Sequence, residues 1–412
     1  MKKHGNSKRS KALAVALLGM SLLLAAPTVA TAAPDSGNTA PSADAPVTPT
    51  DPTLSSKTAE PDPDWAPTEN PKATIVQGQM RSDREEIPEP FTKADADKAE
   101  TMEARLSTAR VTAGCQVYWP SPFEVCGAIR DKYNSLGGPG SFLSFPTTAE
   151  LTNPGNTGKR TQFLNGPIYW SAAGGAHPVV NSFLNRWGVH GYEAGWLGYP
   201  TTDEIVHADG VGRRQEFQNG AIYVAFQNAV GSAIKNGPIR DKWNTVGAET
   251  AGSLLGYLTG DEIPLPDGQG RMARFERGVI YWHPTLGAQP VVGSILTRWA
   301  AMGYEASQLG YPTSGEVVNP DGVGRRQAFQ NGAIYWKAPY GAHEAFGPLF
   351  AKWQEYGFEA GWLGYPVANI GPSTGDWTTV SQVQAIFENG GLFLDTATGT
   401  ILEGVRVNTP EE

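Results

Sequence analysis

The sequence predicts a mainly β fold with short helices, arranged as a repeat array behind a disordered N-terminal linker. One motif recurs five times after residue 110, at intervals of 54 to 58 residues. The 412 residues include 49 Gly and 32 Pro beside 12 Trp and 14 Tyr, a mixture that suits short strands and tight turns better than long helices. The first 110 residues differ sharply in composition from the rest. These three observations define the expected architecture.

The N-terminus has the pattern of an export signal. Five lysine and arginine residues precede an apolar run over 12–26, and Ala30-Thr31-Ala32 offers the small residues of a cleavage site. We therefore expect residues 1–33 to be a signal peptide and the protein to be secreted and associated with the cell envelope. No later stretch reaches the roughly 18 to 20 apolar residues that a membrane span needs.

Residues 34–110 are expected to form a disordered linker. They are rich in Pro, Ala, Thr, Ser and acidic residues, and contain Trp65 but no Tyr or Cys. The segment from Thr92 to Leu106 is compatible with a short helix. We expect this helix to be solvated or loosely docked, and a recognition element for a partner is the alternative.

The region 111–405 is expected to be one domain of five repeats, followed by a tail at 406–412. Each repeat begins with a tetrapeptide of the Leu-Gly-Tyr-Pro type, and a Phe 20 residues after its leucine, or 24 in the fifth copy, opens a second block. In a third block an aliphatic residue precedes an aromatic one by four. The leucines of the tetrapeptides are Leu143, Leu197, Leu255, Leu309 and Leu363.

Each block predicts one structural element. In the second block, Asn-Gly pairs such as Asn165-Gly166 favour a two-residue turn with positive φ and hence a β-hairpin. The strand after this turn alternates, so that Ile334 and Trp336 share one face and Tyr335 takes the other. The third block has helical spacing and runs into a glycine. One repeat is thus a short helix, a turn and a hairpin.

Units this small must pack on one another, because none can bury a core alone. Val117-Tyr118-Trp119 reads as an orphan copy of the hairpin's second strand, and the last hairpin is degenerate. We therefore expect the ends to meet in a closed five-fold array resembling a five-bladed β-propeller, and expect a monomer. The alternative is an open solenoid, which would need polar caps that the sequence does not reveal.

Two cysteines flank the orphan strand. In an exported protein, Cys115 and Cys126 are most simply a disulfide. A redox-active pair is the alternative, although the spacing is not Cys-x-x-Cys.

These motifs resemble the LGFP repeat family. The resemblance rests on the five tetrapeptides, on Thr-Thr-x-Glu after them (residues 147–150 and 201–204) and on the Phe-x-Asn-Gly-x-Ile-Tyr-Trp block, and it covers residues from about 111 to 403. The third copy has Leu258 in place of Pro, and the fifth lacks the acidic residue. Similar repeats occur in secreted proteins of mycolic-acid-containing actinobacteria. The resemblance therefore implies a role in attachment to the cell envelope or in its recognition.

One Glu and one cation recur in each of the first four units. We expect them to pair within the unit, which would make both structural; a ring of charged side chains around a central site, with Arg213 and Arg325 contacting ligand, is the alternative. The acids are Glu150, Glu204, Glu262 and Glu316, and the cations are Lys159, Arg213, Arg271 and Arg325.

The residue before the tetrapeptide varies, so packing does not demand an aromatic ring there. It is Phe142, Trp196, Leu254, Gln308 or Trp362 in the successive units. Exposed rings at these positions would stack on a sugar. Trp377, in the insertion of the fifth copy, has the same potential. The alternative is that these rings cover the edge of the neighbouring unit.

Charge and motifs narrow the function. A formal net charge of -9 argues against a nucleic-acid partner held through its phosphates. Neither Gly-x-Ser-x-Gly, His-Glu-x-x-His nor a Cys/His cluster occurs, and we expect no enzymatic activity, cofactor or metal. The leading interpretation is a non-catalytic protein that recognises cell-wall polysaccharide, arabinogalactan or peptidoglycan. The alternatives are a glycan hydrolase and a scaffold that docks an exported envelope enzyme.

Overall fold

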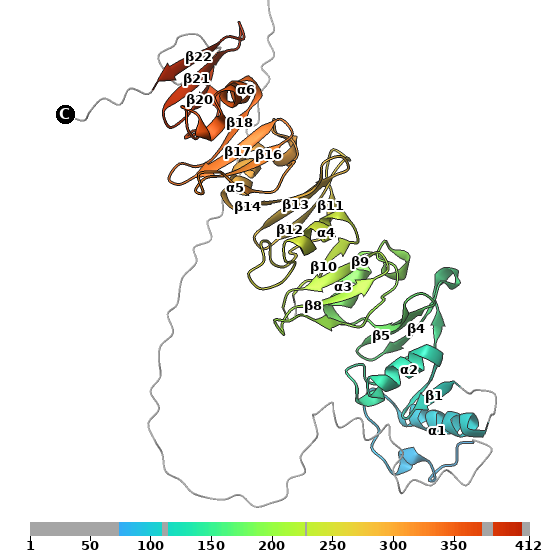
Figure 1. Cartoon of the computed structure of the whole chain (residues 1–412). Helices are drawn as coiled ribbons and strands as arrows, with labels where there is room; N and C mark the ends of the chain where they lie inside the picture. Colours follow the sequence, from blue (N-terminus) through green and yellow to red (C-terminus); the bar gives the residue numbers. More distant parts are fainter. Residues whose placement is uncertain (1–73, 109–113, 227–228, 373–381, 406–412) are drawn as a thin grey trace, which may run out of the picture. The chain divides into compact units, whose positions relative to one another are not determined.

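The computed structural model describes residues 74–108, 114–226, 229–372 and 382–405. The expected signal peptide, residues 34–73 of the expected linker, Trp377 and the tail 406–412 lie outside these ranges. The described part is mainly β with short helices: five four-stranded antiparallel sheets, one two-stranded hairpin and helices between them (Figure 1). None of the helices in these ranges combines the length and apolar character that a membrane crossing requires.

Every four-stranded sheet has its strands in sequence order, beginning with a two-residue edge strand. The first two sheets are β3 (Leu151–Thr152), β4 (Lys159–Phe163), β5 (Gly166–Ser171), β6 (Gly175–Pro178), and β7 (Ile205–Val206), β8 (Arg213–Phe217), β9 (Gly220–Val224), β10 (Ser232–Lys235). The third and fourth are β11 (Ile263–Pro264), β12 (Arg271–Phe275), β13 (Gly278–His283), β14 (Gly287–Val292), and β15 (Val317–Val318), β16 (Arg325–Phe329), β17 (Gly332–Lys337), β18 (Gly341–Phe346). The fifth is β19 (Gly371–Pro372), β20 (Gln382–Ile386), β21 (Gly390–Asp395) and β22 (Ile401–Val405).

The predicted hairpins are present, but their turns sit one residue earlier than expected. Phe163 pairs with Gly166, so the loop is Leu164-Asn165 and the glycine opens the next strand. In the second sheet the equivalent Gly220 is required by close approach, because a Cβ there would overlap the carbonyl oxygen of Ile234. The expectation that Asn-Gly supplies two turn residues was therefore wrong.

The predicted helices follow the sheets and bury the predicted side chains. They are α2 (Gly127–Ser135), α3 (Asn181–Val189), α4 (Pro238–Thr245), α5 (Gly293–Met302) and α6 (Gly347–Glu355). Trp187, Trp243, Trp299 and Trp353 are completely buried. Glycines such as Gly191, with φ of 86°, follow the helices in the left-handed conformation, as predicted.

Neighbouring repeats share their hydrophobic cores. The core around α5 contains Ile334 of β17 and has Trp336 packed against it, whereas Tyr335 of the same strand lies in the core around α6. The predicted alternation of faces is thus confirmed. Each sheet from the first to the fourth contributes to a core on both of its faces, one with the helix before it and one with the helix after it.

The tyrosine of each Leu-Gly-Tyr-Pro turn reaches into the preceding repeat. Tyr311 donates its hydroxyl to Asp267 at 2.7 Å, and Tyr365 donates to Asp321 at 2.6 Å. Each of these aspartates also accepts backbone N–H groups of its own turn, as is common for Asp in turns. A Cβ on Gly324 would overlap the Tyr365 hydroxyl, so a glycine is needed beneath the ring.

The first strand is not an orphan. β1 (Cys115–Tyr118) pairs with β2 (Ser121–Cys126), and the fifth sheet pairs only within itself in the described part. The pairing argument for closure was therefore wrong, and closure into a ring stays a prediction.

A helix covers the outer face of this hairpin. The helix α1 (Lys93–Thr108) occupies the predicted segment, but it buries Ala96 and Ala99 completely against Val117 and Trp119. The helix is thus packed more closely than the solvated or loosely docked helix that we expected. It acts as the cap that the sequence did not reveal.

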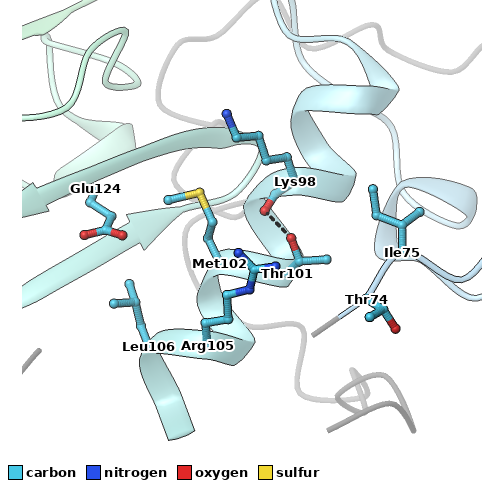
Figure 2. A pocket seen from close by; sticks show the side chains of 8 residues that line it. All are labelled: Thr74, Ile75, Lys98, Thr101, Met102, Arg105, Leu106 and Glu124. Atoms are coloured by element: carbon cyan, nitrogen blue, oxygen red, sulfur yellow. Dashed lines mark hydrogen bonds between the residues drawn. The ribbon is translucent and has the colours of Figure 1, made fainter. Parts of the chain in front are cut away.

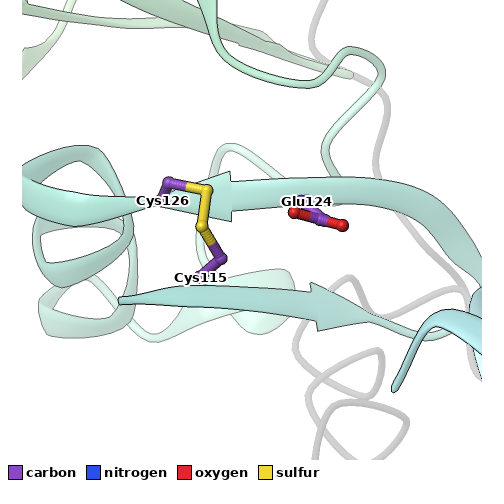
Figure 3. Close-up of side chains that lie close together, drawn as sticks. All are labelled: Cys115, Glu124 and Cys126. Carbon is purple, nitrogen blue, oxygen red and sulfur yellow. A yellow bond between two sulfur atoms is a disulfide. The ribbon is translucent and has the colours of Figure 1, made fainter. Parts of the chain in front are cut away.

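The predicted disulfide is present (Figure 3). Cys115 and Cys126 are directly opposite each other in the β1–β2 register, and their sulfur atoms are bonded. Glu124 lies close by. Because both sulfurs are consumed in the disulfide, this group offers no thiolate to a metal ion.

Candidate functional site

The recurring charged residues pair within each repeat, as predicted. Lys159 Nζ lies 2.5 Å from Glu150, and Arg325 lies 2.9 Å from Glu316. Arg213 pairs with Glu204 and Arg271 with Glu262. Each Glu stands just before or at the edge strand, and its partner begins the next strand of the same sheet. The pairs therefore hold the edge strands in place.

The variable position before the tetrapeptide is accessible in most units. The side chains of Phe142 and Trp362 are 52% and 39% exposed, whereas Trp196 is partly buried. In four of the five units a turn asparagine holds the backbone of this position, as where the Asn165 side chain donates to the Phe142 carbonyl at 2.9 Å; the third unit has Arg277 instead. The backbone is thus held while the side chain is free to vary.

Two of the predicted residues meet at one junction. Phe142, from the turn after α2, and Arg213, from β8 of the following sheet, line the same cavity of about 460 Å³. Its other lining residues include Asn181, Asp203 and Glu204. We call this cavity, between the first and second sheets, the first junction groove. It offers an exposed aromatic ring beside several polar groups, which is the composition of a small-molecule or sugar site.

The carboxylate of Asp203 is held ionised at the wall of this groove. Lys132 and His177 each lie 2.7 Å from one of its oxygens. Burial of Asp203 acts to raise the pKa, but these two hydrogen bonds outweigh it and leave the pKa of Asp203 below its ordinary value. The other ring nitrogen of His177 is hydrogen-bonded to the Gly174 carbonyl at 2.8 Å. The Asp203 carboxylate is thus an ionised hydrogen-bond acceptor held in a fixed place.

The next junction has a smaller cavity of about 150 Å³. It is lined by Lys235, Asn236, Pro238, Glu262, Arg271 and Trp282, among others. We call it the second junction groove. Its lining comes from the end of β10, the start of α4 and the charged pair of the third sheet. The first groove is built in the same way, from the end of β6, the start of α3 and the charged pair of the second sheet.

Trp196 stands beside the second junction groove. Its indole N–H donates to His190 Nδ1 at 3.1 Å, and Lys235 Nζ lies 5.2 Å from the centre of its ring. Its ring also covers Gly220, since a Cβ there would lie 2.9 Å from the ring. Trp196 therefore covers the hairpin of its own repeat rather than the edge of the neighbouring one, and keeps a side toward Lys235.

The remaining predicted residues lie apart from these grooves. Arg325 belongs to the charged pair of the fourth sheet, and the residue that corresponds to Phe142 at that junction is Leu254 rather than an aromatic ring. Trp362 lies over Gly390 of the fifth sheet, and the centre of its ring is 5.8 Å from that of the Tyr356 ring. The structure thus brings Phe142 and Arg213 together, but not Trp362 and Arg325.

A further cavity, of about 530 Å³, lies outside the repeats (Figure 2). The helix α1 supplies Lys98, Met102 and Leu106, and β2 supplies Glu124. None of the predicted site residues lines it. It belongs to the cap.

Sequence reasoning missed Asp203 and Asn181. Asp203 occupies the variable position of Thr-Thr-x-Glu, which is Ala149 in the first unit and Gly315 in the fourth. Asn181 adopts a φ of 51°, a conformation that favours Gly or Asn. The variation at the position of Asp203 was a usable signal, because a residue needed for packing would recur in every unit.

Helix–sheet units that share each core with the next unit define a repeat protein. The sequence model of the LGFP repeat family matches residues 143–195, 197–250, 255–307 and 309–361, just over half of the chain. The chain belongs to the LGFP repeat family. The fifth sheet lies beyond these matches, although Pro366 bridges to Phe387 in it as Pro200 bridges to Phe217 in the second.

Other comparisons add little. A search of curated proteins finds no match. The extracellular domain of a hybrid two-component system from B. thetaiotaomicron is 10% identical over 63% of this chain, with a TM-score of 0.12. Apo AztD from Citrobacter koseri is 12% identical over 65% of this chain, with a TM-score of 0.11. The alignments span 30% and 61% of those two chains, and such scores support no inference about this protein.

Proposed function

We propose that the protein is an exported, non-catalytic module that binds cell-wall polysaccharide in the grooves between neighbouring repeats. The observation that carries the proposal is the meeting of Phe142 and Arg213 in the first junction groove. An exposed ring supplies a stacking surface, and fixed polar groups around it supply hydrogen bonds for hydroxyls. The expected export signal and the envelope association implied by the LGFP resemblance point to a glycan of the cell wall.

The polar groups of this groove are already positioned before a ligand arrives. Glu204 is held by Arg213, and Asp203 by Lys132 and His177. Ordering of these side chains therefore costs little on binding. The same contacts argue against glycan hydrolysis here, because a general acid needs a raised pKa and the pKa of Asp203 is lowered.

Co-sedimentation of the full chain with protein-free cell wall tests this function. We expect Phe142→Ala to lower retention about threefold to tenfold, through loss of ring stacking. Phe226→Ala is the matched control, because the Phe226 ring is 61% exposed and does not line either junction groove.

Three outcomes are informative. If Phe142→Ala lowers retention on cell wall and Phe226→Ala does not, the first junction groove is supported as the site. If both variants are retained equally, the groove is not the binding site. Failure of the unaltered protein to sediment with cell wall would reject polysaccharide binding.

A further inference from the structure

Lys235 is a charged residue at a position that apolar residues occupy in other repeats. In the sheet register it lies opposite Gly220, and the residues opposite the equivalent glycines of the third, fourth and fifth sheets are Val292, Phe346 and Val405. A lysine at a position otherwise held by apolar residues gives up packing, and it must keep its ammonium group accessible. Such a departure from the repeat pattern indicates a local role.

The ammonium group of Lys235 is not used in the fold's ion pairs. Within the described ranges, Lys235 Nζ takes part in no salt bridge, and it lies 5.2 Å from the centre of the Trp196 ring. Its backbone N–H donates to Glu262 at 3.1 Å, which fixes the strand beside the groove. The cation is therefore positioned while its charge stays available.

The two junction grooves differ in charge. In the first, the acids Asp203 and Glu204 are each paired with a cation. The second is lined by Lys235 and Arg271 with Glu262, whose side chain is only 5% exposed. Because Glu262 is already engaged by Arg271, one positive charge is left uncompensated in the second groove. In a chain with a formal charge of -9, this is a local exception.

We propose that the second junction groove is a distinct binding site for an acidic sugar, a saccharide whose carboxylate is bound by Lys235 and Arg271. Trp282 lines the groove and Trp196 stands beside Lys235, so rings are available for the sugar while the cations take its charge. The volume of about 150 Å³ suits one charged group or one sugar residue. The inference rests on the proposed function and adds a ligand class to it.

Binding of tri-galacturonic acid and of its carboxyl-reduced form to the full chain tests the assignment. We expect the carboxylated ligand to bind about tenfold or more tightly, the effect of hydrogen bonds to a charged group. Lys235→Val should remove most of this preference, because the reduced form has no carboxylate for the Lys235 ammonium group to bind. Valine is compatible with the fold because Val292 and Val405 hold the equivalent position.

Lys242→Gln is the matched control for net charge, because Lys242 lies on α4 and does not line the groove. It should keep the preference. Equal binding of both ligands, or an unchanged preference in Lys235→Val, would overturn the acidic-sugar site and leave cell-wall binding standing. Displacement by inorganic phosphate at the same concentration as the carboxylated ligand would indicate a plain anion site and would also overturn it. Cell-wall retention, measured separately, decides the broader function.

Discussion

At the scale of single residues, the most demanding contacts are those between a tyrosine and the glycine of the preceding repeat. Tyr199, Tyr257, Tyr311 and Tyr365 each lie over a glycine that a Cβ would make too crowded. The tetrapeptide tyrosine is therefore conspicuous in the sequence because it joins units, rather than because it shapes its own turn.

Gly324→Ala should destabilise the protein by about 1 to 3 kcal/mol, the usual range for overpacking. Its methyl group would overlap the Tyr365 hydroxyl. Gly260→Ala, where a Cβ meets no atom within 4 Å, should change stability by less than about 0.5 kcal/mol. Urea unfolding of both variants measures the difference, and equal stabilities would contradict this account of the junction.

Tyr365→Phe tests the polar half of the same contact. The Tyr365 hydroxyl is the main reason that the pKa of Asp321 is lowered. A lowered pKa stabilises the folded state at neutral pH, and this contribution is lost as the pH falls through the folded pKa. The variant should melt below the unaltered protein at pH 7, and the gap should narrow in acid. A gap independent of pH would mean that the hydroxyl does not act through Asp321.

At the scale of elements, docking of the cap helix α1 buries the carboxyl group of Glu103, which disfavours its charged form. Burial raises the pKa of Glu103 to about 7, against the opposing effects of Arg81 and of the Trp119 backbone N–H. Nearby Glu100 and Glu85 raise it further. Glu103 is thus largely neutral in the docked helix below that pH.

Docking of α1 should therefore weaken as the pH rises. Because the pKa is raised in the docked state, this stabilisation is complete below the ordinary Glu pKa of 4.5 and is lost as the pH rises from there through about 7. Hydrogen exchange of the α1 amides, corrected for intrinsic rates, should show more frequent opening near pH 9 than near pH 6. Glu103→Gln should flatten the dependence. An equally strong dependence in the variant would exclude Glu103 as its cause.

The local elements were largely predictable, and their surroundings were less so. The helical spacing of apolar residues predicted the helices around Trp187 and Trp353, and the Asn-Gly pairs predicted the hairpins. Both signals depend only on residues that are close in the sequence. The cap was assigned to the linker, since α1 packs through small residues such as Ala96 and Ala99 that resemble a disordered segment in composition. The partner of Val117 was overlooked, because β2 lacks the repeat's motifs.

At the scale of the whole molecule, shared cores explain why the residues that line each groove come from two units. Each groove takes its wall from the end of one sheet and its charged pair from the next. Composition and motifs named Phe142 and Arg213 separately, but their meeting depends on how one repeat packs on another. That geometry follows from tertiary contacts and was beyond the sequence.

A double-mutant cycle on glycan binding tests the central claim, that one site is built from two repeats. Phe142→Ala, Arg213→Gln and the double variant would be compared for binding to a soluble cell-wall polysaccharide fragment, after thermal melting has confirmed that all three are folded. Residues in one site should be coupled, so the double variant should lose less affinity than the product of the two single losses. Independent losses that multiply, or no loss in either single variant, would contradict a shared groove.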